Sequence, residues 1–288
     1  MPGIADPPTT TETTSATLAR CLDCGRGLEA LGHCPGCGRA YPIVGGILQA
    51  IGPLTGTNRI AAAFYDGPGW PRFRPFERLF LTFQGGQAGA RRQILKHLPD
   101  RPRDRLRVLE VGIGDGDNLP FLPERWEVHG VDVARTQLAA CRDRFPEMGG
   151  RLSCAEAEAL PFPDATFDAV YSVGGFNYFR DPARALREMR RVARPGSPVV
   201  VADEIPGLKR FTLGHLVGCR KLDEWALRAL GLDRAFVRMV LGLRLDVDAL
   251  ARDVWPGCRR HRIWSRLGYC LVDPDPRRRV EAEGGFSR

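Results

Sequence analysis

Four cysteines near the start of the chain stand in two pairs, Cys21 with Cys24 and Cys34 with Cys37. Two residues separate the members of each pair, and glycine follows each second cysteine. This spacing places two thiolates on a tight turn, and two such turns can converge into a closed tetrahedral shell that suits zinc. A closed shell has no open coordination position, so the predicted ion is structural. Two reduced redox pairs are the alternative.

A glycine-rich turn follows an apolar run at 107–111, which predicts a short strand. The glycines of this turn are Gly112, Gly114 and Gly116. A strand that leads into a glycine turn and then a helix is typical of nucleotide-binding sites. A dinucleotide site needs glycine where this chain has Asp117, and Glu110 adds a carboxylate before the turn. The acidic turn favours a cationic ligand such as S-adenosylmethionine (SAM), which carries no phosphate.

Another carboxylate, Asp132, follows the next predicted strand, 127–131. An acid at the tip of this strand can accept hydrogen bonds from both hydroxyls of a ribose. Its position after the glycine turn favours the ribose role over the alternative, a cap for a helix at 134–144.

The elements that position these groups alternate between strands and helices. Further strands are predicted at 151–155, at 168–172 and at 198–202. Asp181 and Pro182 predict the start of a helix that runs to Val192, and Pro195 and Gly196 follow its end. Strands that alternate with helices predict a parallel α/β sheet.

Residues 105–204 closely resemble the class I SAM-dependent methyltransferases, particularly the branch of ubiquinone and menaquinone methyltransferases. Four segments carry the resemblance: 109–116, 131–132, 157–164 and 187–196. It implies a Rossmann-like, seven-stranded α/β sheet, which two closing strands at 259–264 and 268–272 would complete.

The resemblance also implies roles for individual residues. The glycine turn and Glu110 would hold the methionyl end of SAM, Ser172 and Val173 would face its amine, and Glu156 would meet the adenine amino group. The segment around Tyr65 resembles the covering helix of the family, which implies that Tyr65 closes over the cofactor. Plain packing is the alternative role for this side chain. The full set of expected cofactor contacts is Tyr65, Glu110, Gly112, Gly114, Gly116, Asn118, Asp132, Val133, Glu156, Ala157, Ser172 and Val173.

Methyl transfer needs few protein groups for the chemical step, because SAM is already activated and the enzyme mainly aligns the acceptor. The candidate catalytic residues are Tyr178, Glu204 and His215, and packing is the alternative for the histidine. The segment 174–179 lacks the Asn/Asp-Pro-Pro-aromatic tetrapeptide of methyltransferases that act on nucleobase amines. A long segment at 206–256 predicts a helical lid with two apolar sides over an apolar acceptor.

Three regions are expected along the chain. Residues 1–17 are predicted to be a disordered leader, 18–52 a zinc ribbon, and 53–288 a SAM-dependent methyltransferase domain that contains the lid. The ribbon resembles small zinc-ribbon domains that activate or accompany certain methyltransferases.

The composition leaves two alternatives open. The chain has 288 residues, a formal net charge of +8 and no apolar stretch of the roughly 20 residues that span a membrane. Only four of the nine cysteines are paired by spacing, which does not fit a disulfide framework, and the start of the chain lacks the apolar core of a secretory signal. A cytoplasmic protein is therefore expected. The leading function is methylation of a small aromatic, quinone-like or natural-product-like acceptor at oxygen, carbon or nitrogen. An RNA methyltransferase and a non-enzymatic zinc-ribbon module are the alternatives, and a homodimer is possible.

Overall fold

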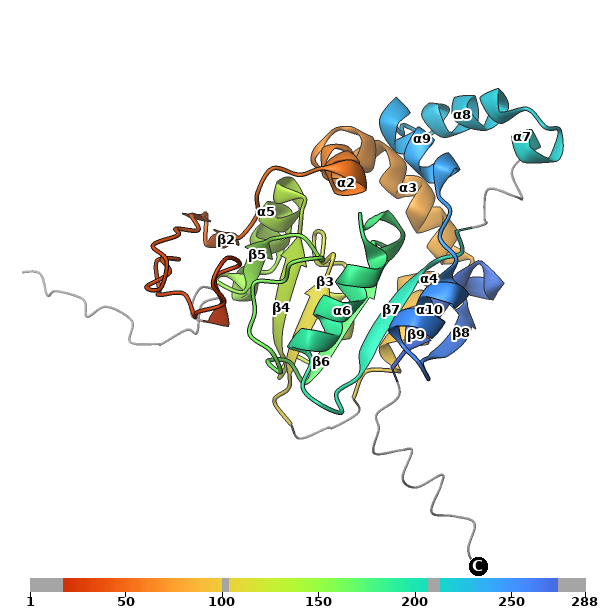
Figure 1. Ribbon diagram of the computed structural model, residues 1–288. Helices are drawn as coiled ribbons and strands as arrows, with labels where there is room; N and C mark the ends of the chain where they lie inside the picture. Colours follow the sequence, from red (N-terminus) through yellow and green to blue (C-terminus); the bar gives the residue numbers. More distant parts are fainter. Residues whose placement is uncertain (1–17, 100–103, 207–212, 274–288) are drawn as a thin grey trace, which may run out of the picture.

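A single mixed sheet runs through the protein (Figure 1). The computed structural model describes residues 18–99, 104–206 and 213–273, so the predicted leader lies outside the described residues. The strands are β1 (Ile43–Val44), β2 (Ile47–Gln49), β3 (Arg107–Val111), β4 (Glu127–Asp132), β5 (Leu152–Cys154), β6 (Ala169–Val173), β7 (Val199–Glu204), β8 (Arg259–Ile263) and β9 (Gly268–Val272). Their order in the sheet is β1-β2-β5-β4-β3-β6-β7-β9-β8.

The expected seven-stranded sheet is present as β5-β4-β3-β6-β7-β9-β8, and its class I methyltransferase architecture is confirmed. Strands β5, β4, β3, β6 and β7 are parallel, and β9 and β8 close the sheet in the antiparallel sense. Two strands from the ribbon segment extend it, because β2 pairs in parallel with β5 and β1 forms a hairpin with β2. The described sheet therefore has nine strands, and the ribbon is joined to its edge.

Helices cover both faces of the sheet, so its central strands are mostly apolar. On β3, Val108 and Leu109 are fully buried, and they point to different core clusters because side chains alternate along a strand. Helices α4 (Gly86–Leu95) and α5 (Arg135–Arg144) pack on one face. Helices α6 (Pro182–Val192) and α10 (Val247–Val254) pack on the other (Figure 1).

Helix α6 begins as predicted. The Asp181 side chain accepts a hydrogen bond from the backbone N–H of Arg184 at 2.9 Å, and Pro182 occupies the first helical position. Leu186 and Met189 are fully buried against the sheet.

Helices α2 (Gly56–Asp66) and α3 (Gly69–Thr82) cross the ends of the strands. The predicted lid is not one helix with two apolar sides. Its described part, from residue 213 on, holds four helices: α7 (Leu213–Leu216), α8 (Arg220–Ala229), α9 (Arg234–Gly242) and α10. Only part of this segment lies over α2, because α10 packs beside α6 instead. Within the described ranges, none of the helices combines the length and the apolar character needed to cross a bilayer.

Candidate functional site

A cavity lies where the carboxyl ends of β3, β4 and β6 meet helices α2, α3 and α4. Its lining residues are Asn58, Ala61, Tyr65, Trp70, Glu77, Leu81, Ala90, Arg91, Ile94, Val111, Gly112, Ile113, Gly114, Asp115, Asp117, Asn118, Val131, Asp132, Val133, Gln137, Ala155, Ala157, Val173, Gly174, Gly175, Tyr178, Phe179 and Trp264. Ligands of open α/β sheets bind at this end of the strands, so the position alone marks the cavity as the candidate site.

The glycine turn forms the floor of the cavity. Gly112 has φ +79°, a conformation that favours glycine, and the nearest atom to a Cβ added there would be Ser172 Oγ at 3.9 Å. Gly116 also has a positive φ, +81°, and packing is a second reason for glycine at this position. A Cβ there would lie 2.9 Å from Cys141 Sγ and 2.9 Å from a side-chain carbon of Leu119. The structure thus brings Gly112 and Gly114 to the cavity wall and places Gly116 behind it.

Asp132 points toward the glycine turn. Its Oδ2 accepts a hydrogen bond from the Gly114 N–H at 2.8 Å, and its Oδ1 accepts one from the Ala134 N–H at 2.8 Å. Burial raises the pKa of this carboxyl to about 6, although the two backbone donors oppose the shift. Asp132 therefore fastens the turn and still lines the cavity, as does its neighbour Val133.

Glu110 lies beneath the glycine turn, outside the cavity lining. It is fully buried, and its carboxylate accepts hydrogen bonds from Asn118 Nδ2 at 2.5 Å and from the Tyr171 hydroxyl at 2.6 Å. Burial raises the pKa of Glu110 to about 7. Arg91 Nε donates to Asn118 Oδ1 at 3.1 Å. Glu110 thus orients Asn118, which does line the cavity, and a direct contact of Glu110 with a ligand stays a prediction.

Of the residues expected near the adenine, Ala157 lines the cavity and Glu156 lies just outside its lining. Glu156 Oε1 accepts a hydrogen bond from Asn58 Nδ2 at 3.1 Å, and Asn58 itself faces the cavity. The sequence did not indicate Asn58, because the residue lies between the cysteine pairs and the glycine turn and belongs to neither motif.

Of the two residues expected near the methionyl amine, Val173 lines the cavity. Ser172 is buried next to the lining, and its hydroxyl has no partner among the described residues. A buried hydroxyl without a partner is costly, so this position favours a ligand with a polar group near the end of β6.

The covering helices contribute the part of the lining that sequence reasoning missed. Tyr65 lines the cavity as expected, and Trp70, Glu77 and Arg91 join it. The Trp70 Nε1 and one carboxylate oxygen of Glu77 are buried without a partner in the described chain, and burial raises the pKa of Glu77. No local motif marks these positions, since only the fold brings their helices over the strand ends.

The structure places two of the three candidate catalytic residues, Tyr178 and Glu204, next to each other. Tyr178 lines the cavity, and its hydroxyl donates to Glu204 Oε1 at 2.9 Å. Burial raises the pKa of both groups. The neighbouring Asp203 has its pKa raised to about 8, first by burial and then by the charge of Glu204. The side chain of His215 lies outside the described part of the structure.

Asn177, beside Tyr178, has a structural role. It is buried, its Nδ2 donates to the Glu204 carbonyl oxygen at 2.7 Å, and its Oδ1 accepts from the Tyr269 hydroxyl at 2.9 Å. The Asn177 side chain thereby fixes the turn that presents Tyr178 to the cavity.

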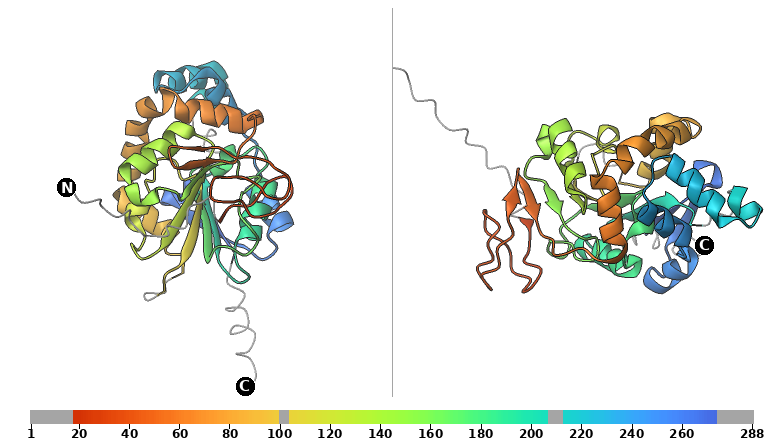
Figure 2. Two further views of the ribbon diagram at one scale, coloured as in Figure 1. Left: turned by 90° about the vertical axis from the view of Figure 1, so that its left-hand side faces the viewer. Right: turned by 90° about the horizontal axis from the view of Figure 1, so that it is seen from above.

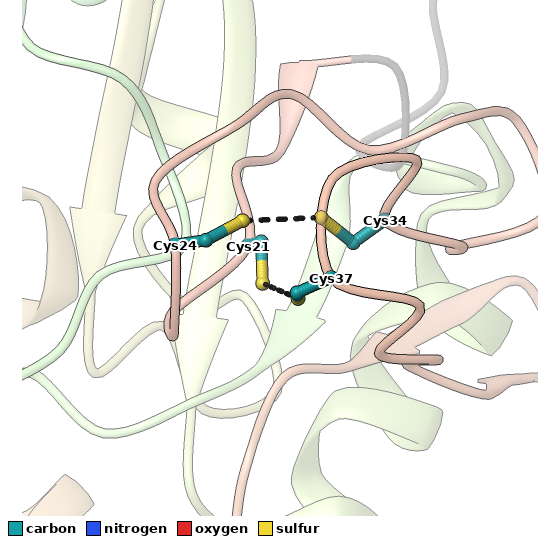
Figure 3. Close-up of side chains that lie close together, drawn as sticks. All are labelled: Cys21, Cys24, Cys34 and Cys37. Carbon is teal, nitrogen blue, oxygen red and sulfur yellow. Dashed lines mark hydrogen bonds between the residues drawn. The ribbon is translucent and has the colours of Figure 1, made fainter.

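The four paired cysteines converge at a second site, in the segment predicted to be a zinc ribbon (Figure 3). All four Sγ atoms lie within 4.8 Å of one another, with 3.5 Å between Cys21 and Cys37 and 3.3 Å between Cys24 and Cys34. Each close approach joins one cysteine of the first turn to one of the second. Four thiol sulfurs this close together are compatible with the donor set of a tetrahedral metal site.

Comparison with known proteins assigns the family. The family described as a methyltransferase domain matches residues 109–201. Phosphatidylethanolamine N-methyltransferase from Cereibacter sphaeroides is 40% identical over 101 residues, which make up 34% of this chain and 50% of the relative. Demethylmenaquinone methyltransferase from Thermus thermophilus is 38% identical over 141 residues, or 47% of this chain and 62% of the relative.

A demethylmenaquinone methyltransferase from Roseiflexus castenholzii is 37% identical over 176 residues, which cover 58% of this chain and 71% of that protein. The chain belongs to the class I SAM-dependent methyltransferase family, as the motif resemblance predicted. It spans between half and two thirds of the length of the first two relatives.

Proposed function

We propose that the protein transfers the methyl group of SAM to an apolar small molecule. The observation that carries this proposal is the cavity at the strand ends, where the glycine turn and Asp132 share one lining with an aromatic and aliphatic wall. SAM would supply an activated methyl group, and the protein would align the acceptor with it and exclude water.

The residues present fit SAM. Asp132 would accept from the ribose hydroxyls, and Ala155 and Ala157 would flank the base. The unpartnered Ser172 hydroxyl and the open space above Gly112 suit the polar methionyl end. A side chain at Gly112 would project into this space, which supports close approach of a ligand to the backbone.

The acceptor would occupy the part of the cavity formed by the covering helices. Leu81, Ile94 and Trp264 make that wall apolar, and Trp70 adds an aromatic ring. The names of the relatives include a demethylmenaquinone methyltransferase and a malonyl-[acyl-carrier protein] O-methyltransferase, which supports a small-molecule acceptor. The Tyr178 hydroxyl would contact the reacting group of the acceptor. It would take the proton that this group loses and give its own proton to the Glu204 carboxylate.

The positive charge gives little support to the RNA alternative. Many of the arginines are neutralised within the protein, since Arg74, Arg107 and Arg191 each form ion pairs with acidic side chains. Such pairs leave less charge available for phosphate contacts.

We also propose that the four-cysteine cluster holds one structural zinc. The four sulfurs, which lie within 4.8 Å of one another, would close a tetrahedral shell around the ion and leave no position for a reacting molecule. The ion would shape the ribbon, and it would take no part in methyl transfer.

Two measurements test the proposed function. Isothermal calorimetry is expected to show SAM binding to the purified protein, and mass analysis is expected to find a methylated product among candidate apolar acceptors. NAD is expected not to bind, because Asp117 occupies the position where a dinucleotide site needs glycine. Absence of SAM binding by the folded protein would contradict the proposal.

Replacing Asp132 with alanine is expected to weaken SAM binding by about 1–3 kcal/mol, since charge-assisted hydrogen bonds to ribose hydroxyls are lost. The wild-type affinity should also fall as the pH is lowered through about 6, because protonation of Asp132 removes an acceptor from the site. Calorimetry from pH 5 to pH 8 checks both effects.

The matched control is Asp143→Ala, which removes an exposed carboxylate from α5. Its SAM affinity should equal that of the wild type at every pH. An Asp132→Ala variant with unchanged affinity would place the ribose elsewhere.

A further inference from the structure

Three large apolar side chains project from one short stretch of the lid. Leu216 is 71% exposed, Val217 is 60% exposed and Trp225 is 69% exposed. They belong to α7, α8 and the turn between them, at the opposite end of the molecule from the ribbon (Figures 1 and 2). Such exposure in neighbouring residues is costly in water and marks an interaction surface.

A groove runs beneath α8, between this part of the lid and helices α2 and α3. Its lining residues are Ala63, Phe64, Pro68, Gly69, Arg72, Lys221, Glu224, Trp225, Arg228, Ala229, Gly231, Leu232, Asp233, Arg234 and Val237. Trp225 therefore belongs both to the projecting set and to the groove. The groove and the three projecting side chains are referred to below as the lid surface.

The lid surface carries a surplus of positive charge. Arg72, Lys221, Arg228 and Arg234 line the groove, and none of them forms an ion pair with an acidic side chain of the described chain. Two acidic residues, Glu224 and Asp233, also line the groove, so the four basic side chains exceed the acidic ones by two. Charge complementarity therefore favours an anionic partner.

One layer of aromatic rings separates the groove from the SAM cavity. Phe64 lines the groove and stacks on Phe236 with ring centroids 3.9 Å apart. On the other side, Tyr178 lies 5.3 Å from Phe236 and Tyr65 lies 5.2 Å from Phe64, and both tyrosines line the cavity. The linings of the groove and the cavity are therefore in contact through these rings.

We propose that the lid surface binds an anionic lipid surface and that the groove is the route by which an apolar acceptor enters from it. Trp225 would sit at the headgroup level, as tryptophan does at membrane interfaces, and the four cations would meet anionic headgroups. Leu216 and Val217 would enter the acyl boundary. An acidic protein would match the cations but would leave these aliphatic side chains without a partner. The entry route rests on the proposed function, whereas lipid binding does not.

Sedimentation with vesicles tests the proposal without SAM or acceptor. The full chain is expected to bind vesicles of phosphatidylcholine with phosphatidylglycerol and to bind pure phosphatidylcholine much more weakly. Each cation near the surface contributes about fivefold. Lys221→Glu with Arg228→Glu removes two cations and should therefore lower the partition coefficient by at least about twenty-five-fold. Brominated acyl chains should quench tryptophan fluorescence in the wild type, and Trp225→Phe should abolish most of this quenching.

The charge control is Arg184→Glu with Arg187→Glu, two exposed residues of α6. The apolar control is Leu31→Ala, which is 79% exposed in the ribbon. Both controls should bind vesicles as the wild type does. Equal losses in the control and lid variants, or binding to an acidic carrier protein without binding to vesicles, would overturn the proposal. Calorimetry with SAM on the same samples keeps this result separate from a failure of the proposed function.

Discussion

Replacement of Cys34 and Cys37 by serine is expected to yield a protein without bound metal and with an unfolded ribbon. The four sulfurs lie within 4.8 Å of one another, and a structural zinc held by such a set contributes apparent binding free energies of about 10–16 kcal/mol. Two thiolates cannot retain that ion. Elemental analysis should find about one equivalent of zinc per wild-type chain and none in the variant.

The loss of stability in this variant should extend beyond the ribbon. Strand β2 pairs with β5 through Leu48 and Gln49, and Leu48 is buried in the same core cluster as the central strands. An unfolded ribbon would therefore expose one edge of the sheet and lower the thermal stability of the whole protein.

The matched control for this experiment is Cys219→Ser, which changes an exposed cysteine outside the cluster. Its zinc content, its proteolysis pattern and its melting temperature should equal those of the wild type. Zinc retained after Cys34 and Cys37 are both replaced would show that the cluster does not hold the metal.

The central strands could be predicted closely from the sequence. The predicted ranges 107–111 and 268–272 coincide with β3 and β9. Buried parallel strands are uninterrupted apolar runs, and the glycine turn and the cap at Asp181 give sharp local boundaries. The four cysteines were found for a similar reason, since their spacing is local and their chemistry is specific.

The features that could not be predicted from the sequence depend on contacts between segments that are distant in the chain. The pairing of β2 with β5 joins residues about a hundred positions apart, and no local pattern in the ribbon indicates it. The lid was predicted as one helix, but Gly218 and Gly231 adopt positive φ angles that end one helix before the next begins. The motif predicted a contact of Glu110 with the ligand, and only the structure shows that the Glu110 carboxylate accepts from Asn118, which lines the cavity.

Replacement of Glu204 by glutamine is expected to lower kcat/KM by about 10²–10⁴-fold for an acceptor that loses a proton, such as a phenol. Glu204 Oε1 accepts from the Tyr178 hydroxyl at 2.9 Å, and Tyr178 faces the cavity. Burial raises the pKa of Glu204, which brings a carboxylate base closer to neutral pH and makes it more effective. Glutamine keeps the shape of the side chain but cannot take the proton.

The pH profile distinguishes this role from simple packing. The wild-type kcat/KM should rise with pH as Glu204 loses its proton, and the Glu204→Gln profile should be flat over the same range. Tyr178→Phe should cause a similar loss, and the double variant should be little worse than either single one, because the two groups act as a unit. SAM affinity should be unchanged in all three variants.

Tyr269→Phe is the matched control, since it removes the hydrogen bond to Asn177 behind the same turn without altering the cavity wall. A structural role for the whole cluster predicts that this control and Glu204→Gln lose activity together and keep the same pH profile. A proton-accepting role predicts that the control retains most of its activity and that Glu204→Asp recovers part of the rate with its pH dependence. If Glu204→Gln instead keeps the wild-type rate and profile, Tyr178 and Glu204 only position the acceptor, and the proton leaves by another route.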